Sequence, residues 1–187
     1  GQDERLSPEE KARRERTRQL GSGITDFFPA PHAEMLLIPL SGRLYTFELG
    51  SRKVRALPVA GPVLDPKWSP DGSKIAYLRK HDLFCFDLKR GRELPITRGG
   101  TALIRHGEAE FVAQEEMHRL SGYCWGPDSR QIAFQEADHR GVEVWHISDP
   151  LHPEAPPVAQ YYPRPGKKNV RSRLGVVQLG QKPRYYS

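Results

Sequence analysis

The chain has 187 residues, of which 37% are hydrophobic and 28% are charged, values typical of a soluble globular domain with its own core. Its longest apolar stretch, Met35–Leu40, is far shorter than the roughly 18 residues of a membrane-spanning helix, so we expect no membrane span. The formal net charge of +6 arises from basic residues at the two ends without interleaved aromatic residues, and we therefore expect no nucleic-acid partner.

The chain begins with a helix signal. Ser7-Pro8-Glu9-Glu10 combines an N-cap residue, a proline in the first turn and a reciprocal glutamate. Gly21 and Gly23 then end the pattern. We assign residues 1–20 to an N-terminal helix.

An internal repeat follows the helix. Residues 68–77 read Trp-Ser-Pro-Asp-Gly-Ser-Lys-Ile-Ala-Tyr, and residues 125–134 read Trp-Gly-Pro-Asp-Ser-Arg-Gln-Ile-Ala-Phe. A weaker copy starts at Pro29. In each full copy an aromatic residue ends one strand, the Pro-Asp segment makes a turn, and Ile-Ala-Tyr/Phe begins a buried strand. Repeats of this kind indicate a propeller or solenoid architecture.

A second strand follows each copy, at Arg43–Leu49, Asp82–Leu88 and Val142–Ile147, and a further strand is expected at Arg92–Thr97. Each repeat therefore predicts one blade of about four antiparallel strands. We expect a mainly β fold: residues 21–187 form a partial β-propeller of about three four-stranded antiparallel blades. The expected blades lie near residues 24–60, 61–100 and 121–187.

Three blades are too few to close a propeller, which needs about four to eight. The chain is therefore expected to be part of a longer protein, to pair with other chains, or to leave strand edges open. Open edges favour association, so a homodimer is one expected partner arrangement. The two cysteines, Cys85 and Cys124, are too few for a disulfide framework, and we expect two buried thiols.

The interval between repeats predicts an insertion. The copies start at residues 29, 68 and 125, so the second interval is 18 residues longer than the first. We place the insertion at residues 101–120 and expect a short helix whose inner face consists of Phe111, Val112 and Leu120. Insertions in propellers extend from one face as loops, and such loops often carry function.

Glu115 and Glu116 lie near the middle of the insertion. On a helix, neighbouring side chains are about 100° apart and can converge on one ligand. Two adjacent carboxylates repel each other unless a cation lies between them, and a peptide's amino-terminal ammonium is such a cation. The alternative is that both glutamates form a solvated helix surface.

The stretch Glu110-Phe-Val-Ala-Gln-Glu-Glu-Met, followed by Ser121-Gly-Tyr-Cys-Trp-Gly-Pro-Asp, closely resembles the propeller of the dipeptidyl peptidase IV family, in the prolyl oligopeptidase superfamily. Residues 162–169 and 173–177 resemble the segment that follows that blade. The likeness covers residues 24–179, and it is strongest over residues 106–136.

The resemblance implies a specific role for the insertion. In this family an eight-bladed propeller caps an α/β-hydrolase domain, and paired glutamates bind the free amino terminus of the peptide substrate. By position, Glu115 and Glu116 match that pair, and Gln114 stands where some members have a third acidic residue. The implied function is release of amino-terminal dipeptides, usually X-Pro or X-Ala, together with a catalytic domain outside this chain. Relatives in bacteria also imply a periplasmic or secreted location.

The catalytic machinery of the family is not found in the sequence. The chain contains no Gly-x-Ser-x-Gly nucleophile elbow, no His-Glu-x-x-His zinc signature and no glycine-rich phosphate loop. We therefore expect no catalytic residue, no metal and no cofactor in this chain, and no peptide cleavage by the chain alone. The alternative function is a non-enzymatic propeller module that binds protein partners; binding of nucleic acid or anionic lipid ranks last.

Overall fold

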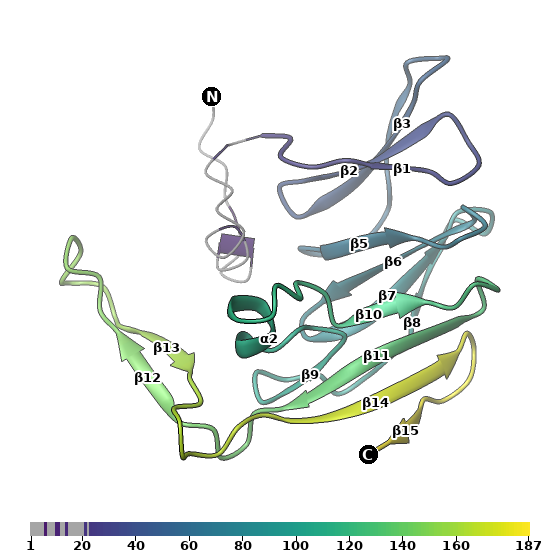
Figure 1. Cartoon of the computed structure of the whole chain (residues 1–187). Helices are drawn as coiled ribbons and strands as arrows, with labels where there is room; N and C mark the ends of the chain where they lie inside the picture. The colour runs from purple at the N-terminus through teal and green to yellow at the C-terminus, as the bar shows by residue number, and fades with distance from the viewer. Residues whose placement is uncertain (1–5, 7–9, 12–13, 15–20, 22) are drawn as a thin grey trace.

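The structure is a computed structural model that describes residues 6, 10, 11, 14, 21 and 23–187. Three antiparallel sheets follow one another along the chain, and each packs against the sheet that precedes it (Figure 1). A two-stranded hairpin extends away from one end of the third sheet (Figure 1).

The first two sheets each contain four strands in chain order. The first sheet is formed by β1 (Phe28–Pro29), β2 (Met35–Leu40), β3 (Arg43–Glu48) and β4 (Val54–Ala56). The second is formed by β5 (Leu64–Trp68), β6 (Lys74–Arg79), β7 (Asp82–Asp87) and β8 (Arg92–Pro95). These sheets confirm the predicted mainly β fold of four-stranded antiparallel units.

The third sheet is assembled from distant parts of the chain. Its main order is β10 (Tyr123–Trp125), β11 (Gln131–Asp138), β14 (Arg171–Gln178) and β15 (Arg184–Tyr186), and β9 (Ile104–His106) also pairs with β11. Between β11 and β14 the chain forms the protruding hairpin of β12 (Val144–Ile147) and β13 (Val158–Tyr161).

The assignment of Val142–Ile147 as the second strand of the third blade is wrong. β14 occupies that place and pairs with β11 along its whole length, from Gln131↔Gln178 to Asp138↔Arg171. The physical reason is burial: β14 contributes Val177 to the core, whereas all four residues of β12 are exposed.

The two full repeats form similar turns between paired strands. Between β5 and β6, Asp71 Oδ1 accepts a hydrogen bond from Ser73 N at 3.0 Å. Between β10 and β11, Asp128 Oδ1 accepts one from Arg130 N at 3.0 Å. The Asp71 N–H donates to Ser129 Oγ at 2.9 Å, so the turns of neighbouring sheets are bonded to each other.

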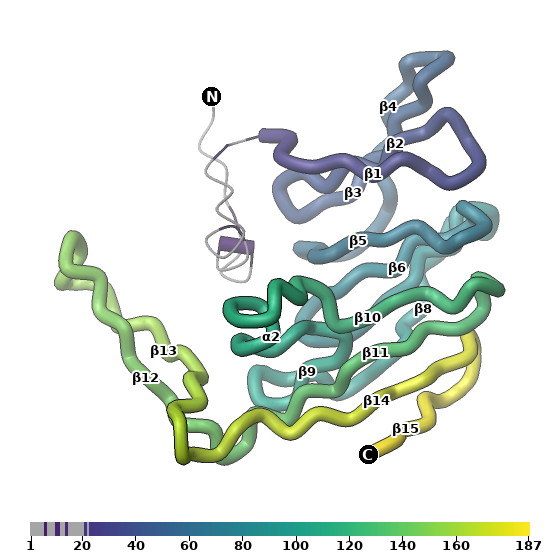
Figure 2. The backbone as a smooth tube through the Cα atoms, in the orientation of Figure 1, coloured from purple at the N-terminus to yellow at the C-terminus, as the bar shows by residue number. Residues whose placement is uncertain are grey.

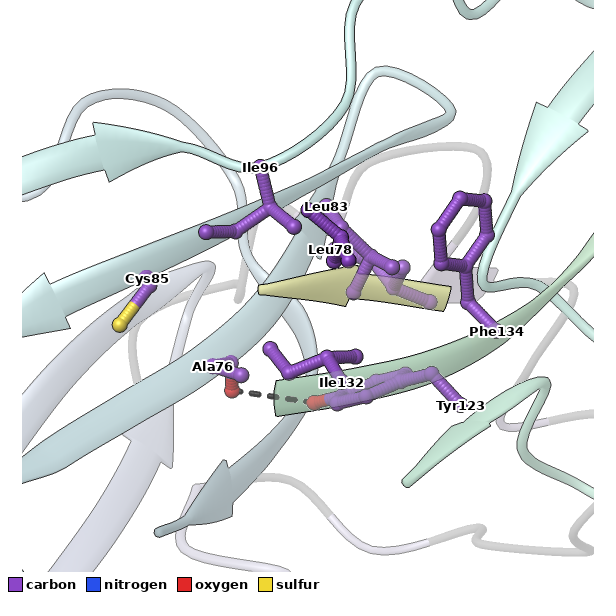
Figure 3. Close-up of a cluster of buried hydrophobic side chains, with 9 residues drawn as sticks. Ala76, Leu78, Leu83, Cys85, Ile96, Tyr123, Ile132 and Phe134 are labelled. Carbon is purple, nitrogen blue, oxygen red and sulfur yellow. Dashed lines mark hydrogen bonds between the residues drawn. The ribbon is translucent and has the colours of Figure 1, made fainter. Parts of the chain in front are cut away.

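Two hydrophobic clusters fill the spaces between the sheets, and β6 contributes to both because its side chains alternate. Ile75 and Tyr77 belong to the cluster between the first and second sheets. Ala76 and Leu78 belong to the cluster between the second and third sheets (Figure 3). In this second cluster the Tyr123 hydroxyl donates to the Ala76 carbonyl at 3.0 Å, which links β10 to β6 (Figure 3).

Both cysteines are free thiols, but their surroundings differ. Cys85 on β7 is fully buried, as expected. Cys124 on β10 is exposed, so the expectation of a buried thiol is wrong there. Its neighbours Tyr123 and Trp125 pack toward the second sheet, and strand alternation turns Cys124 to the opposite face of the third sheet.

Helices make a small contribution to the described part of the chain. The expected N-terminal helix, residues 1–20, falls mostly outside the described residues, although Glu10, Lys11 and Arg14 are helical. The other helix is α2 (Phe111–Glu115), in the predicted insertion. Within the described ranges, no helix has both the length and the apolar composition needed to cross a bilayer.

Candidate functional site

The predicted insertion leaves the edge of the third sheet and returns to it at one place, here called the neck, which is formed by Gly107 and Gly122. β9 and β10 pair one after the other with the same edge of β11, which is bonded on its other edge to β14. Between them, Gly107 N donates to Gln135 O at 2.8 Å and Gln135 N donates to Gly122 O at 2.7 Å. Residues 108–121, here called the excursion, therefore begin and end at one point of β11. Figure 2 shows the backbone leaving β9, forming α2 and returning into β10.

Glycines form both sides of this neck, because the space there excludes side chains. Gly122 N donates to Gly107 O at 3.1 Å, so the two backbones are in contact. A Cβ atom on Gly122 would lie 2.5 Å from the carbonyl oxygen of Glu108. Gly107 has a φ of 75°, and a Cβ atom there would lie 2.8 Å from Leu83 Cγ.

Within the excursion, α2 begins at a side-chain cap. The Glu110 carboxylate accepts a hydrogen bond from Ala113 N at 2.7 Å, which satisfies one of the free amides of the first turn. Ala113 is the fully buried residue of α2, while Phe111 and Val112 are half-buried. The expectation that Leu120 belongs to the inner helix face is wrong, because Leu120 follows the helix and is 45% exposed.

Glu115 and Glu116 lie at the end of α2, as its last residue and its C-cap. Both are exposed, and Glu116 keeps helical backbone angles, with φ −102° and ψ −28°. Their side chains therefore leave the backbone about 100° apart rather than on opposite faces of a strand. Gln114 differs from both, because its Nε2 donates to Ala109 O at 2.5 Å and its side chain turns back into the excursion.

Polar contacts tie both ends of the excursion to the second sheet. At the start, Glu108 Oε1 lies 2.8 Å from His81 Nδ1, on the turn between β6 and β7. At the end, Ser121 Oγ donates to Asp65 Oδ2 at 2.6 Å and also contacts Lys67 Nζ. The Lys67 ammonium donates to Tyr123 O at 2.7 Å as well. These contacts fix the position of α2 relative to two sheets.

An aromatic contact joins α2 to the base of the hairpin. The rings of Phe111 and Tyr162 meet edge to face with centroids 5.3 Å apart. Tyr162 in turn packs against Trp145 of β12 at 5.6 Å. Rings in this geometry attract each other beyond their buried area, so the hairpin supports the side of α2.

Sequence reasoning proposed the two glutamates as a binding pair but missed the residues that hold α2 in place. His81, Lys67 and Tyr162 come from three segments distant from the excursion, and their contacts arise from sheet packing that the sequence does not show. The neck glycines were a detectable signal, since Gly107 and Gly122 directly flank residues 108–121.

Chemically, the end of α2 presents two exposed carboxylates on a short, supported helix. Such a pair can accept charge-assisted hydrogen bonds from one ammonium group, which carries three donors. Among the described residues, no group of three or more His, Cys, Asp and Glu side chains is placed to hold a metal ion.

Solved structures show the same fold. The chain superimposes on the crystal structure of Porphyromonas gingivalis dipeptidyl peptidase 4 with a TM-score of 0.68 and 21% sequence identity. The match covers 88% of this chain and 23% of that protein, so the likeness includes most of this chain and only a part of a larger molecule.

Related sequences point to one family. The chain is 31% identical over 102 residues to a probable dipeptidyl-aminopeptidase B of Podospora anserina, covering 52% of this chain and 11% of that protein. It is 28% identical over 133 residues to dipeptidyl peptidase 8 of Mus musculus, covering 62% of this chain and 15% of that protein. The chain thus spans less than a sixth of the length of these relatives. Residues 34–186 match the family described as the dipeptidyl peptidase IV N-terminal region, and the chain belongs to this family.

Proposed function

We propose that this chain is the substrate-anchoring propeller region of a dipeptidyl peptidase, and that Glu115 and Glu116 bind the free amino terminus of the peptide. The observation that carries the proposal is the placement of both carboxylates at the exposed end of α2, on an excursion fixed to two sheets. Gln114 has a supporting role, because its amide braces the excursion from within.

The anchoring role explains why the product would be a dipeptide. A bound ammonium fixes the distance from the amino end of the peptide to the catalytic groups of a hydrolase domain outside this chain. Peptides whose amino end is blocked lose the cation that both carboxylates require. Release of X-Pro or X-Ala dipeptides is the reaction we propose for the whole protein, with an α/β-hydrolase domain as the partner that supplies the catalytic triad.

The test compares Glu115→Gln and Glu116→Gln with the unchanged complete enzyme on a Gly-Pro chromogenic substrate. Each variant should lower kcat/KM about thirtyfold or more, because a carboxylate that pairs with a desolvated ammonium is removed. This change corresponds to a loss of about 2 kcal/mol in transition-state stabilisation. Glu154→Gln is the matched control, since Glu154 is an exposed glutamate on the hairpin. Full kcat/KM in both α2 variants would contradict the proposal.

The anchoring step also predicts a dependence on substrate charge. An α-amino group loses its proton at about pH 8, so affinity for the peptide should weaken as the pH rises through that value. A substrate with an acetylated amino end should be cleaved poorly and should not distinguish the glutamine variants from the unchanged enzyme. If the acetylated substrate is cleaved as well as the free one, the ammonium is not what this region binds.

The alternative, a non-enzymatic propeller module, differs from the peptidase in having no hydrolase domain in the same protein. A Gly-x-Ser-x-Gly elbow in the downstream reading frame would favour the peptidase. Self-association through open strand edges and a periplasmic or secreted location both stay predictions.

A further inference from the structure

A buried histidine, His106, comes immediately before the neck of the excursion. His106 is the last residue of β9, and its side chain is 4% exposed. Its Nδ1 lies 2.8 Å from Asp82 Oδ1, at the start of β7 in the second sheet. Its Nε2 lies 3.2 Å from Glu136 Oε2, on β11 of the third sheet. One imidazole therefore bridges carboxylates from two sheets.

Both ring nitrogens face carboxylate oxygens, and only the doubly protonated imidazolium can donate to both. Burial alone lowers the pKa of His106, but the hydrogen bonds and negative charge of Asp82 and Glu136 outweigh it, so the pKa is raised above its ordinary value. The charged form is thus the form that this environment favours.

The groups around His106 form a balanced cluster. Asp82 also accepts hydrogen bonds from Thr97 Oγ1 at 2.6 Å and from Gly100 N at 2.9 Å. Glu136 pairs with Arg173 of β14, whose Nε lies 2.9 Å from Glu136 Oε1. Burial, and then the charge and hydrogen bond of Glu136, raise the pKa of Tyr185 on β15. With His106 charged, two cations face two carboxylates; without its proton, one negative charge is uncompensated.

His106 is joined directly to the backbone of the neck, so this charged cluster affects the position of the excursion. The next residue is Gly107, whose backbone forms one side of the neck. The backbone N–H of His106 also donates to the backbone carbonyl of His81 at 2.9 Å. The side chain of His81 is the one that pairs with Glu108. Movement of His106 would therefore shift the neck and the contact that fixes the start of the excursion.

We propose that His106 is a positioning residue, which holds β9 between Asp82 and Glu136 and thereby fixes the neck from which the anchoring glutamates extend. The role of this residue in substrate binding rests on the function proposed above for Glu115 and Glu116. His106 itself is buried beneath the neck and acts through the backbone of the excursion.

The pH dependence has a definite sign. Folding raises the pKa of His106 above the unfolded-state pKa of 6.5. Its contribution to the stability of the folded state is therefore complete at pH values below 6.5. This contribution is lost as the pH rises through the pKa of the folded state. The substrate ammonium loses its proton in the same direction, so a pH profile of activity alone does not separate the two effects. A variant at His106 separates them.

The first experiment measures amide hydrogen exchange in the 187-residue chain. In His106→Gln, the amides of Gly107, Gly122 and Gln135 should exchange about tenfold faster, because the positive charge between Asp82 and Glu136 that holds β9 is lost. The amides that pair β6 with β7, such as Tyr77, should keep their protection. His106→Lys keeps a cation between the carboxylates and should restore part of the neck protection, without titration between about pH 6 and 9.

The unchanged chain supplies a second measurement that does not depend on a folded variant. After correction for intrinsic rates, protection of the neck amides should fall as the pH rises through the pKa of His106, measured from its imidazole NMR signals. Neck protection that stays constant through that titration would overturn the proposal, and so would unchanged neck exchange in His106→Gln.

The activity arm uses the complete enzyme. His106→Gln should raise KM for a free-amine substrate about tenfold and change kcat little, because the anchor is displaced while the catalytic groups are not. If Glu115→Gln raises KM and His106→Gln does not, this inference fails and the proposed function stands. If Glu115→Gln and Glu116→Gln both leave KM and kcat unchanged, both proposals fail.

Discussion

Glu108 Oε1 lies 2.8 Å from His81 Nδ1, so the first residue of the excursion is paired with the turn between β6 and β7. Both side chains are largely shielded from water, with exposed fractions of 17% and 19%. The excursion, which carries the proposed binding residues, is thereby attached to a neighbouring sheet as well as to its own. The attachment gives α2 a fixed place despite its length of five residues.

Glu108→Gln should weaken this attachment. The variant removes a carboxylate that faces His81 and also lies 3.5 Å from Arg105 Nη1, and we expect a loss of about 1 kcal/mol in the free energy of unfolding. Urea unfolding of the 187-residue chain measures the change. Glu154→Gln, at an exposed position, is the control; equal stability of the two variants would show that the Glu108 pair does not hold the excursion.

Gly122→Ala should open the neck. The added methyl group would lie 2.5 Å from the backbone of Glu108, which cannot move away as a flexible side chain would, and we expect a loss of about 1–3 kcal/mol. Gly50→Ala is the matched control, because its Cβ would meet Glu34 Oε2 at an ordinary 3.7 Å. The melting temperatures of both variants give the comparison, and an equal effect of the two changes would contradict the close contact at the neck.

The two thiols should differ sharply in reactivity. Burial raises the pKa of Cys85 to about 12, so its thiolate is scarce and inaccessible, whereas Cys124 is exposed. A disulfide reagent should modify one thiol in the native chain and two in denaturant. Cys124→Ser should abolish the native reaction, and persistence of that reaction in the variant would show that Cys85 is accessible.

Glu93 should contribute stability that depends on pH. Burial by itself raises the pKa of Glu93, but hydrogen bonds from Arg79, at 2.6 and 2.7 Å, and from Tyr77 outweigh it, and the pKa is lowered. A lowered pKa stabilises the folded state above the unfolded value of 4.5, and this stabilisation is lost as the pH falls through the folded value.

Glu93→Gln therefore should cost about 1–2 kcal/mol at neutral pH and progressively less below pH 4.5. Urea unfolding of both chains across that range measures the difference. A difference that stays constant with pH would mean that the charge of Glu93 is not what stabilises the contact.

The sequence predicted the features that depend on local chemistry. The Trp-Ser-Pro-Asp-Gly turn and the Ile-Ala-Tyr strand lie within ten residues, so the repeat gave the hairpins β5–β6 and β10–β11 correctly. The insertion and its helix followed from the unequal spacing of the repeats. The choice of Glu115 and Glu116 as a binding pair came from their adjacency and from the surrounding motif, and their role stays a prediction.

Features that depend on distant pairing could not be predicted. Val142–Ile147 alternates like a strand, but the partner of β11 is β14, whose Arg171 pairs with Asp138 across the intervening hairpin. Local pattern does not distinguish these two strands; they differ in packing, because Val177 of β14 joins Ile132 and Phe134 in a buried cluster. The bridge from Asp82 through His106 to Glu136 was invisible for the same reason, since each residue belongs to a different strand.

The alternation of β6 has a consequence for how the chain tolerates change. Ile75 and Tyr77 fill one hydrophobic cluster, and Ala76 and Leu78 fill the other. A strand shifted by one residue presents each side chain to the wrong neighbour. A single deletion just before Ala76 would therefore place Ala76 where Ile75 packs and Tyr77 where the methyl group of Ala76 fits, so one change would disturb both hydrophobic clusters.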